Sequence, residues 1–340
     1  MKMRFLGNTG LLVSTLCLGT ASFGGRGGYE RTGTIEQKEA DQIVSMCIDS
    51  GINLFDTAED YSKGLAEEIL GKALGAKRQD VIVVGKVHPT RSPGPNDGGF
   101  SRKHIIEGCE ASLKRLGTDY LDVYELHMYD DYAPMEVTLR ALDDLVRQGK
   151  VRYIGCSNFT GWEVMKGIAI SDKNGWERFM TLEALYSIAS RWLEFELGPL
   201  CVDQGIGILA FSPLHGGYLS GKYRRNRPWP QGARFAGPST SGGWPVDIEE
   251  LYNIVDELDV VAQAHDSSIA QAALNYLLHK PGVSSLIIGI RTAKQLEENI
   301  GATDWEMTLE EFARLDQLSE PVRKHPYYKY NPVKKPAWHP

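Results

Sequence analysis

The chain has 340 residues, a length that fits two ordinary domains or one large (β/α)₈ barrel. Its hydrophobic content of 42% and charged content of 24% are ordinary for a globular protein. A net charge of −7 argues against a nucleic-acid-binding surface, although an anionic cofactor can still bind at helix N-termini and a few local cations.

Cysteine usage points to a reduced compartment. The five cysteines are widely spaced and form no CxxC motif, which argues against a disulfide framework and against a zinc site. The N-terminal residues show no charged-then-apolar signal pattern, and no apolar run reaches the roughly 18 residues that a membrane helix needs. We therefore expect a cytoplasmic protein with no metal and no membrane partner.

The predicted elements begin with a short hairpin over Met3 to Val13 and continue as an alternation of strands and helices. The predicted strands are 15–19, 52–56, 81–85, 120–126, 152–156, 181–185, 206–211 and 285–289. The predicted helices are 36–50, 65–75, 102–116, 136–148, 162–171, 194–203, 249–265 and 268–279. Strict alternation predicts a parallel sheet, and eight units favour one closed (β/α)₈ TIM barrel over residues 1–340.

Local signals agree with these boundaries. Ser101 is a favourable N-cap for the helix at 102–116, while Gly117 and Gly149 follow two helices as stop signals. Gly-rich and Pro-rich segments at 24–28, 88–100 and 214–247 predict long loops, which are often functional. The proline-containing tail at 321–340 is expected to be irregular.

A dinucleotide-binding fingerprint is the main competing interpretation. Gly205 to Ala210 matches G-x-G-x-x-A by letter, but the segment enters a strand and does not open a helix after one. A Rossmann domain is therefore disfavoured.

Four residues fall where successive strands end: Asp56, Tyr61, Lys86 and His127. In a parallel barrel the C-terminal ends of all strands open onto one face, and that face carries the chemistry. We therefore expect these four side chains to meet. Each residue type alone has an ordinary explanation, such as helix capping by an Asp-Thr pair.

The four residue types match the needs of carbonyl reduction. A tyrosine with a pKa of about 10 is a poor proton donor near neutral pH unless its phenolate is stabilised. An ammonium such as Lys86 provides that stabilisation, and a carboxylate such as Asp56 can hold the ammonium in place. His127 would align the substrate oxygen beside Tyr61.

From Met3 to about Leu318 the chain resembles the aldo-keto reductase superfamily. The motifs that carry the resemblance are Leu18-Gly19-Thr20, Phe55-Asp56-Thr57-Ala58 with Tyr61, 64–71, Gly85-Lys86, Leu126-His127 with Asp130, Gly155-Cys156-Ser157-Asn158, Phe211-Ser212-Pro213-Leu214, Gly221-Lys222-Tyr223 and Gly289 with Gln295, Glu298 and Asn299. Each piece is weak alone, whereas the ordered set is specific. The segment from Ser212 to Tyr223 most resembles the bacterial and potassium-channel β-subunit-like branch.

The resemblance implies a nicotinamide cofactor bound without a Rossmann domain. Ser157 and Asn158 would bind the carboxamide, and Phe211 would stack on the nicotinamide ring. The full set of implied cofactor residues is Gly19, Thr20, Asp56, Ser157, Asn158, Glu183, Phe211, Ser212, Pro213, Leu214, Gly216, Ser220, Lys222, Arg234, Gly289, Arg291, Gln295, Glu298 and Asn299. Lys222, Arg234 and Arg291 are cations that could face a 2′-phosphate, which favours NADP(H) over NAD(H).

The sequence departs from the family pattern at three positions. Glu183 stands where relatives usually have glutamine. A carboxylate only accepts hydrogen bonds, whereas the glutamine amide both accepts and donates them. We expect its charge beside the nicotinamide to alter the direction preference of the reaction. Met128-Tyr129-Asp130 lacks a proline before the aspartate, and Gly85 replaces a Ser or Thr before Lys86; neither change removes a catalytic group.

Loop residues are the candidates for substrate contact, and they are Phe23, Arg26, Tyr129, Trp229 and Trp244. Aromatic rings with arginines would suit a sugar-type carbonyl, whereas the ordinary explanation for the tryptophans is that they pack the loop down. Glu59 and Asp60 are expected to be solvated loop residues.

Two other functions stay open. Some barrels of this branch serve as cofactor-bound regulatory subunits with little turnover, and an intact set of four residues does not exclude that role. A hydrolase or lyase using Glu59, Asp60 and Glu183 is the third interpretation. The sequence leaves open the substrate, the physiological direction and the oligomeric state.

Overall fold

The computed structural model describes residues 1–89, 94, 96–229, 247–323 and 325–327. Arg234, Trp244 and most of the tail at 321–340 lie outside the described residues, so the expectations for them stay predictions. Within the described residues, no helix is both long and apolar enough to cross a membrane.

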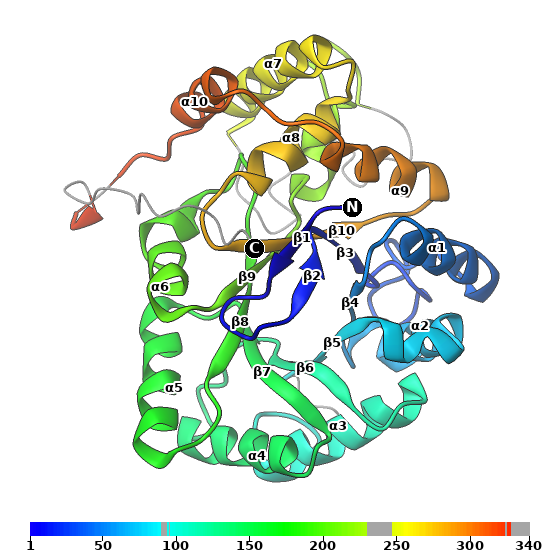
Figure 1. The fold of residues 1–340 in the computed structure, drawn as a ribbon, viewed down its shortest axis with the longest axis vertical. Helices are drawn as coiled ribbons and strands as arrows, with labels where there is room; N and C mark the ends of the chain where they lie inside the picture. The colour runs from blue at the N-terminus through cyan, green and yellow to red at the C-terminus, as the bar shows by residue number, and fades with distance from the viewer. Residues whose placement is uncertain (90–93, 95, 230–246, 324, 328–340) are drawn as a thin grey trace.

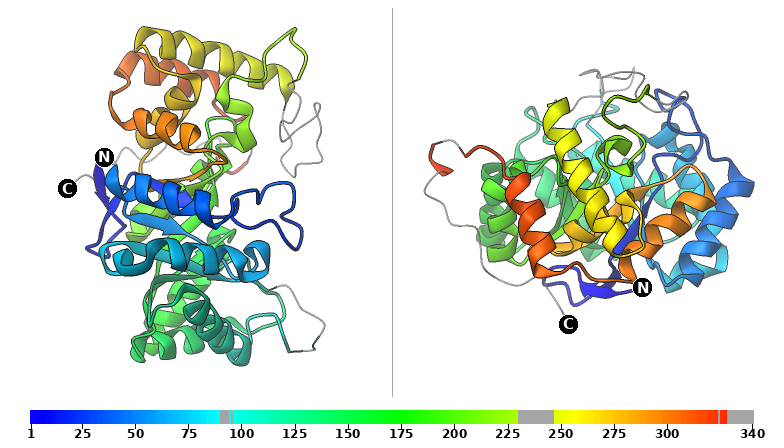
Figure 2. Two further views of the ribbon diagram at one scale, coloured as in Figure 1. Left: turned by 90° about the vertical axis from the view of Figure 1, so that its right-hand side faces the viewer. Right: turned by 90° about the horizontal axis from the view of Figure 1, so that it is seen from above.

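The predicted N-terminal hairpin is confirmed. Strands β1 (Met3–Phe5) and β2 (Leu12–Ser14) pair antiparallel, with Met3 opposite Ser14. Figure 2 shows the hairpin at one end of the barrel and the loop that follows the first barrel strand at the opposite end.

The remaining strands form a closed parallel barrel in the order β10-β3-β4-β5-β6-β7-β8-β9 (Figure 1). Their bounds are β3 (Leu16–Gly19), β4 (Leu54–Asp56), β5 (Ile82–Val87), β6 (Leu121–Leu126), β7 (Val151–Ser157), β8 (Phe179–Leu185), β9 (Gly207–Phe211) and β10 (Val283–Gly289). Each corresponds to a predicted strand. The prediction succeeds because strands buried on both faces appear as apolar runs.

Helices surround the barrel (Figure 1). They are α1 (Gln37–Asp49), α2 (Leu65–Leu74), α3 (Arg102–Leu116), α4 (Met135–Arg147), α5 (Gly161–Asn174), α6 (Leu197–Gln204), α7 (Ile248–Ala264), α8 (Ile269–Leu278), α9 (Ala293–Ile300) and α10 (Leu309–Leu318). The short 3₁₀ segments are η1 (Tyr61–Gly64), η2 (Gly75–Asp80), η3 (Trp192–Phe195), η4 (His215–Ser220) and η6 (Gly301–Thr303).

The predicted helix ends are also present. The Ser101 side chain accepts a hydrogen bond from the backbone N–H of His104, and Gly117 ends α3 in the left-handed conformation with φ 65°. Helices α9 and α10 are additions to the predicted set. Each buries only two side chains, so the apolar period that reveals a helix is too sparse in both segments.

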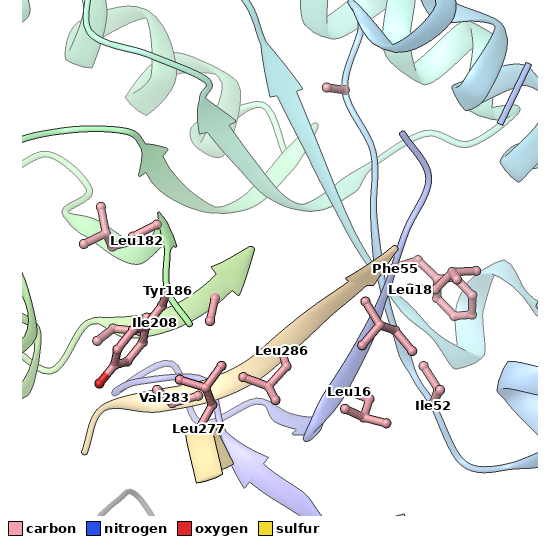
Figure 3. Packing of buried hydrophobic residues seen from close by; sticks show 14 of the residues in the cluster. Leu16, Leu18, Ile52, Phe55, Leu182, Tyr186, Ile208, Leu277, Val283 and Leu286 are labelled. Carbon is pink, nitrogen blue, oxygen red and sulfur yellow. The ribbon is translucent and has the colours of Figure 1, made fainter. Parts of the chain in front are cut away.

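Two apolar cores hold the barrel. The larger core lies between the strands and the helices, and Figure 3 shows Leu16 and Leu18 of β3, Leu286 of β10 and Leu277 of α8 within it. The smaller core contains inward-facing strand residues together with Leu6 and Val13 of the hairpin region. The hairpin therefore closes the end of the barrel that lies opposite the C-terminal ends of the strands.

Candidate active site

On the three neighbouring strands β4, β5 and β6 the inward-facing side chains change from apolar to charged near the C-terminal end of the strand. Side chains two residues apart on a strand point to the same face. Three inward-facing charged residues therefore follow three apolar core residues. Asp56 follows Leu54 on β4, Lys86 follows Val84 on β5, and Glu125 follows Val123 on β6. The charged layer lies at the C-terminal ends of the strands, where a barrel carries its active site.

Lys86 and Asp56 form a buried ion pair. The Lys86 ammonium contacts Asp56 Oδ1 and also donates to the backbone oxygen of Thr57 at 3.2 Å. Lys86 is fully buried and Asp56 is 2% exposed. Burial alone would lower the pKa of Lys86, but the carboxylates of Asp56 and Glu183 raise it well above its usual range. The side chain is therefore a fixed ammonium at neutral pH.

Tyr61 lies against this ammonium. It opens η1 directly after the β4 loop and is 8% exposed, and its ring centroid is 5.3 Å from Lys86 Nζ. Burial raises the pKa of Tyr61 well above its usual value; Lys86 acts in the opposite direction, while Asp56 and Glu183 add to the increase. Tyr61 is therefore a neutral phenol in the resting site.

His127 completes the set, because its ring centroid lies 5.7 Å from that of Tyr61 at an interplanar angle of 74°. The structure thus brings together the four residues that the sequence predicted to meet. His88 lies on the other side, with its ring 5.0 Å from that of His127 in an edge-on arrangement. His88 is half-buried, and burial is the main cause of its lowered pKa.

Asp60 is not a solvated loop residue, contrary to the expectation from sequence. Its Oδ1 lies 3.1 Å from Nδ1 of His127, at ion-pair distance but off the line of a straight hydrogen bond. Its Oδ2 accepts from the Tyr29 hydroxyl at 2.9 Å. Although burial opposes it, the interaction with His127 keeps the pKa of Asp60 below its usual value. Glu59 also has a specific role, because it accepts from the backbone N–H of His88 at 2.8 Å.

Asp60, His88 and His127 bring a carboxylate oxygen and two ring nitrogens within 4.8 Å of one another. Among the described residues this is the one group of side chains with the composition of a metal site. Since Asp60 already pairs with His127 beside Tyr61, the group belongs to the hydrogen-bonding network of the site, and we assign no metal to it.

Glu183 points at the lysine. Its Oε2 lies 3.1 Å from Lys86 Nζ, and the residue is 3% exposed. Burial, together with the charge on Asp56, raises the pKa of Glu183 well above its usual range. The carboxyl group is therefore held inside the barrel against the Lys86 ammonium.

Glu125 is a residue of this site that sequence reasoning missed. It is fully buried on β6, and Oε1 accepts from the Thr181 hydroxyl at 2.6 Å. Burial raises the pKa of Glu125 to about 7. The available signal was the strand period, because Glu125 lies two residues after the apolar Val123 and therefore on the same, inward face of β6. A carboxyl group is almost never fully buried there without a partner.

The residues expected at the nicotinamide end lie next to this layer. Ser157 is buried at the end of β7, and its hydroxyl accepts from the Asn158 side-chain amide at 2.9 Å. That amide also donates to the backbone oxygen of His127 at 3.0 Å. Thr20 follows β3, and its buried hydroxyl has no hydrogen-bond partner among the described residues. An orphaned buried hydroxyl is costly unless a ligand satisfies it, so it fits a polar cofactor group.

The segment after β9 contains the residues that the family resemblance assigns to the pyrophosphate. Ser212, Gly216 and Gly217 all have positive φ. Gly217 has φ +96°, a conformation that favours glycine, and the Lys222 ammonium lies beside it. The other expected residues of this segment are Phe211, Leu214 and Ser220, which are half-buried, and Pro213, which is buried. A loop with accessible backbone and a cation fits a pyrophosphate.

The residues expected at the adenosine end follow β10. Gly289 is exposed, and a Cβ placed on it would meet nothing within 4 Å. The backbone N–H of Arg291 donates to Gln295 Oε1 at 2.8 Å, which folds the turn before α9. Glu298 is exposed and Asn299 is buried. Gly19 is the last residue of β3, and a Cβ added to it would approach the Ile287 side chain to 2.7 Å.

The expected substrate residues differ in exposure. Phe23 is fully buried in the larger core, so its ring supports the loop and does not face solvent. Arg26 is exposed. Tyr129 packs edge-on against Phe159 with ring centroids 5.4 Å apart. Trp229 packs against Tyr223 at 4.7 Å, which anchors the start of its loop.

Comparison with known proteins agrees with this geometry. The model of the Aldo/keto reductase family matches residues 15–320. A probable voltage-gated potassium channel subunit beta from Arabidopsis thaliana is 34% identical, covering 96% of this chain and 98% of that protein. The uncharacterized oxidoreductase YrpG of Bacillus subtilis is 34% identical, covering 94% and 96%. Versiconal hemiacetal acetate reductase of Aspergillus parasiticus is 31% identical, covering 96% and 99%.

These matches extend over nearly the whole chain, and the closed parallel barrel agrees with them. The chain belongs to the aldo/keto reductase family and is an NAD(P)H-dependent oxidoreductase.

Proposed function

We propose that the protein reduces an aldehyde or ketone to an alcohol, or runs the reverse reaction, at the face formed by Asp56, Tyr61, Lys86 and His127. The observation that supports this most directly is the buried Lys86–Asp56 pair behind Tyr61, with the His127 ring 5.7 Å away. A fixed ammonium beside a phenol stabilises the phenolate that remains after proton transfer.

Each side chain has one role in this proposal. When bound, the nicotinamide supplies the hydride that adds to the carbonyl carbon. Tyr61 gives its proton to the developing alkoxide, and Lys86 stabilises the phenolate left behind. Asp56 holds Lys86 in place. His127, oriented by Asp60, hydrogen-bonds the substrate oxygen.

We propose NADP(H) as the preferred cofactor. Ser157, Asn158 and Thr20 would bind the carboxamide end, and the glycine-rich turn with Lys222 would bind the pyrophosphate. Arg291 and Arg234 would pair with a 2′-phosphate, because guanidinium groups bind phosphates bidentately. Gln295, Glu298 and Asn299 would hold the adenosine.

The substrate is proposed to be a polar, sugar-type carbonyl. Tyr29 lies against Tyr61, and the exposed Arg26 belongs to the same loop after β3, so this loop would offer an aromatic ring and a hydrogen-bond donor to a hydroxylated ring. Tyr129 and Trp229 would add aromatic groups from other loops. The five cysteines are all buried and unpaired, which supports a reducing, cytoplasmic location.

The first experiment is a fluorescence titration of the purified protein with NADPH and with NADH, followed by a panel of sugar and simple aldehydes. We expect tighter binding of NADPH and turnover of at least one aldehyde. Tyr61→Phe should lower kcat by about 10²–10⁴-fold while cofactor binding survives, which is the range for loss of a general acid. Failure to bind either cofactor would contradict the proposal.

A second variant separates the cofactor site from the fold. Gly289→Ala adds a methyl group where the protein has no atom within 4 Å, so we expect an unchanged melting temperature and weaker binding of NADPH. Unchanged binding would remove Gly289 from the cofactor site.

A regulatory role is the second candidate, favoured by the similarity to the potassium channel subunit beta of Arabidopsis. Tight NADPH binding without reduction of any aldehyde in the panel would support it over the reductase proposal.

A further inference from the structure

Glu125 and Glu183 approach each other inside the barrel, behind Lys86. Glu125 lies on β6 beside Lys86 of β5 in the strand register, and Glu183 lies two residues after Thr181 on the same face of β8. Both carboxyl groups therefore flank the same ammonium, since Glu183 Oε2 lies 3.1 Å from Lys86 Nζ and Glu125 is the register neighbour of Lys86. A hydrogen bond with Glu183 is one of the causes that act on the pKa of Glu125, although burial is the largest and raises it. Among the described residues, Glu125 Oε2 is buried and has no hydrogen-bond partner.

The backbone makes room for this contact. Gly155 on β7 is the neighbour of both Glu125 and Thr181 in the register. A Cβ at Gly155 would approach Thr181 Oγ1 to 1.9 Å and Glu125 Oε1 to 2.9 Å. A side chain of any size would therefore displace the hydroxyl that orients Glu125.

Two ionised carboxylates cannot hydrogen-bond each other, because both only accept. A proton between them removes that conflict, and like charges in a buried site strongly favour keeping it. The Thr181 hydroxyl donates to Glu125 Oε1, which leaves Oε2 as the oxygen that can share a proton with Glu183.

The other groups that face the pair define its electrostatic surroundings. Lys86 contributes one positive charge and Asp56 one negative charge, so these two cancel. Tyr61 is a neutral phenol, and the thiols of Cys17 and Cys156 are kept neutral, since burial raises the pKa of both well above the usual value. The charge on the carboxyl pair therefore decides the net charge around Lys86.

We propose that Glu125 is a positioning residue that shares a proton with Glu183, and that the charge of this pair sets how strongly Tyr61 holds its own proton. With one shared proton the pair carries one negative charge, which opposes formation of the Tyr61 phenolate and slows proton donation to the substrate. With a second proton bound the pair is neutral, and the Lys86 ammonium is free to stabilise that phenolate. The inference rests on Tyr61 being the proton donor of the proposed function.

The proposal predicts a specific pH profile for carbonyl reduction. The pair gains its charge as pH rises through about 7, the value to which burial raises the pKa of Glu125. In the wild-type protein with NADPH, we expect kcat/KM at pH 6 to exceed that at pH 9 by at least fivefold. In the double variant Glu125→Gln/Glu183→Gln, whose amides cannot ionise, this ratio should fall close to one.

Two further variants guard against a merely structural effect. Glu67→Gln removes a buried carboxyl group that pairs with Arg115 outside the site, and it should keep the wild-type ratio. If the double variant does not fold, the single variant Glu125→Gln must move the midpoint of the profile by at least one pH unit. The proposal is overturned if the double variant keeps the wild-type ratio of kcat/KM between pH 6 and pH 9. It is also overturned if the midpoint of the pH profile does not move in Glu125→Gln.

Infrared spectroscopy of the protein alone tests proton sharing without any substrate. The wild-type protein at pH 7.5 (roughly half a unit above the value of Glu125) should show the C=O stretch of a buried protonated carboxyl group, and the double variant should lack it. Absence of that band in the wild type overturns the inference. Because this readout needs no turnover, it separates failure of the inference from failure of the proposed reductase function.

Discussion

At the scale of single residues, Asp60 connects the loop after β3 to the proposed chemistry. One oxygen of its carboxylate accepts a hydrogen bond from the Tyr29 hydroxyl at 2.9 Å. The other oxygen lies 3.1 Å from Nδ1 of His127. A carboxylate on Nδ1 fixes the imidazole tautomer and orientation, which aims Nε2 at the position of the substrate oxygen. Asp60 thus acts through His127.

We expect Asp60→Asn to lower kcat/KM for aldehyde reduction by about 10- to 100-fold, because the neutral amide no longer provides the charge that orients the His127 ring. Because the amide is the same size, NADPH affinity should not change. Steady-state kinetics and a fluorescence titration measure the two effects. A loss of NADPH affinity equal to the loss of kcat/KM would show that Asp60 only supports the fold.

Tyr29→Phe is the matched control for this network. It removes one donor to Asp60 but leaves the contact with His127 intact, so the expected decrease in kcat/KM is smaller than for Asp60→Asn. An equal decrease would place the effect in the loop that carries Tyr29 and not in His127.

At the scale of elements, Arg4 fastens the hairpin to the barrel. Its guanidinium is 7% exposed and donates to the backbone oxygens of Val283 and of Leu278, the last residue of α8. Burial lowers the pKa of Arg4 to about 10, so the group remains charged at neutral pH. A cation at the C-terminal end of a helix also offsets the helix dipole.

Arg4→Met should therefore lower the free energy of unfolding by about 2 kcal/mol, since two buried carbonyl groups lose their donor while the apolar stem is kept. Urea denaturation measures this change. Lys2→Met is the control, because the exposed Lys2–Glu306 pair should contribute close to nothing. Because the hairpin lies opposite the site, kcat should be unaffected, and a large loss of kcat would contradict the role assigned to Arg4.

The elements also show where prediction from sequence succeeds. The sequence predicts the barrel strands because they are apolar runs. It predicts the meeting of Asp56, Tyr61, Lys86 and His127 because all four follow strands whose C-terminal ends share one end of the barrel. The partners of Glu183 were not predictable in the same way. Strand periodicity places Glu183 inside the barrel, but only the closed geometry brings it to Lys86 and Glu125.

Helix α9 is an element that the sequence did not predict, although its binding motif was recognised. Its segment carries the family motif with Gln295, Glu298 and Asn299, yet only Leu296 and Asn299 are buried, so the sequence shows no apolar stripe. The Thr292 side chain caps it by accepting from the Gln295 N–H. The motif was found by its spacing, while the helix that presents it depends on a cap and on packing against the barrel.

At the scale of the whole molecule, the charged layer inside the barrel links stability to pH. Burial raises the pKa of Glu125 to about 7, whereas the same group in the unfolded chain has a pKa of about 4.3. Between these values the folded protein binds more protons than the unfolded chain does. The free energy of unfolding therefore falls as pH rises from about 4.3 to about 7, and the loss is complete above that range.

Glu125→Gln removes this dependence. From pH 4.5 to pH 8, we expect the unfolding free energy of the variant to rise by about 3 kcal/mol relative to that of the wild type. Urea denaturation at both pH values measures the difference, with the exposed Glu297→Gln on α9 as the control. A constant difference between Glu125→Gln and the wild type would mean that Glu125 is ionised in the folded protein at both pH values. The charge on the carboxyl pair could then not change near neutral pH, and the alkaline loss of activity would need another group.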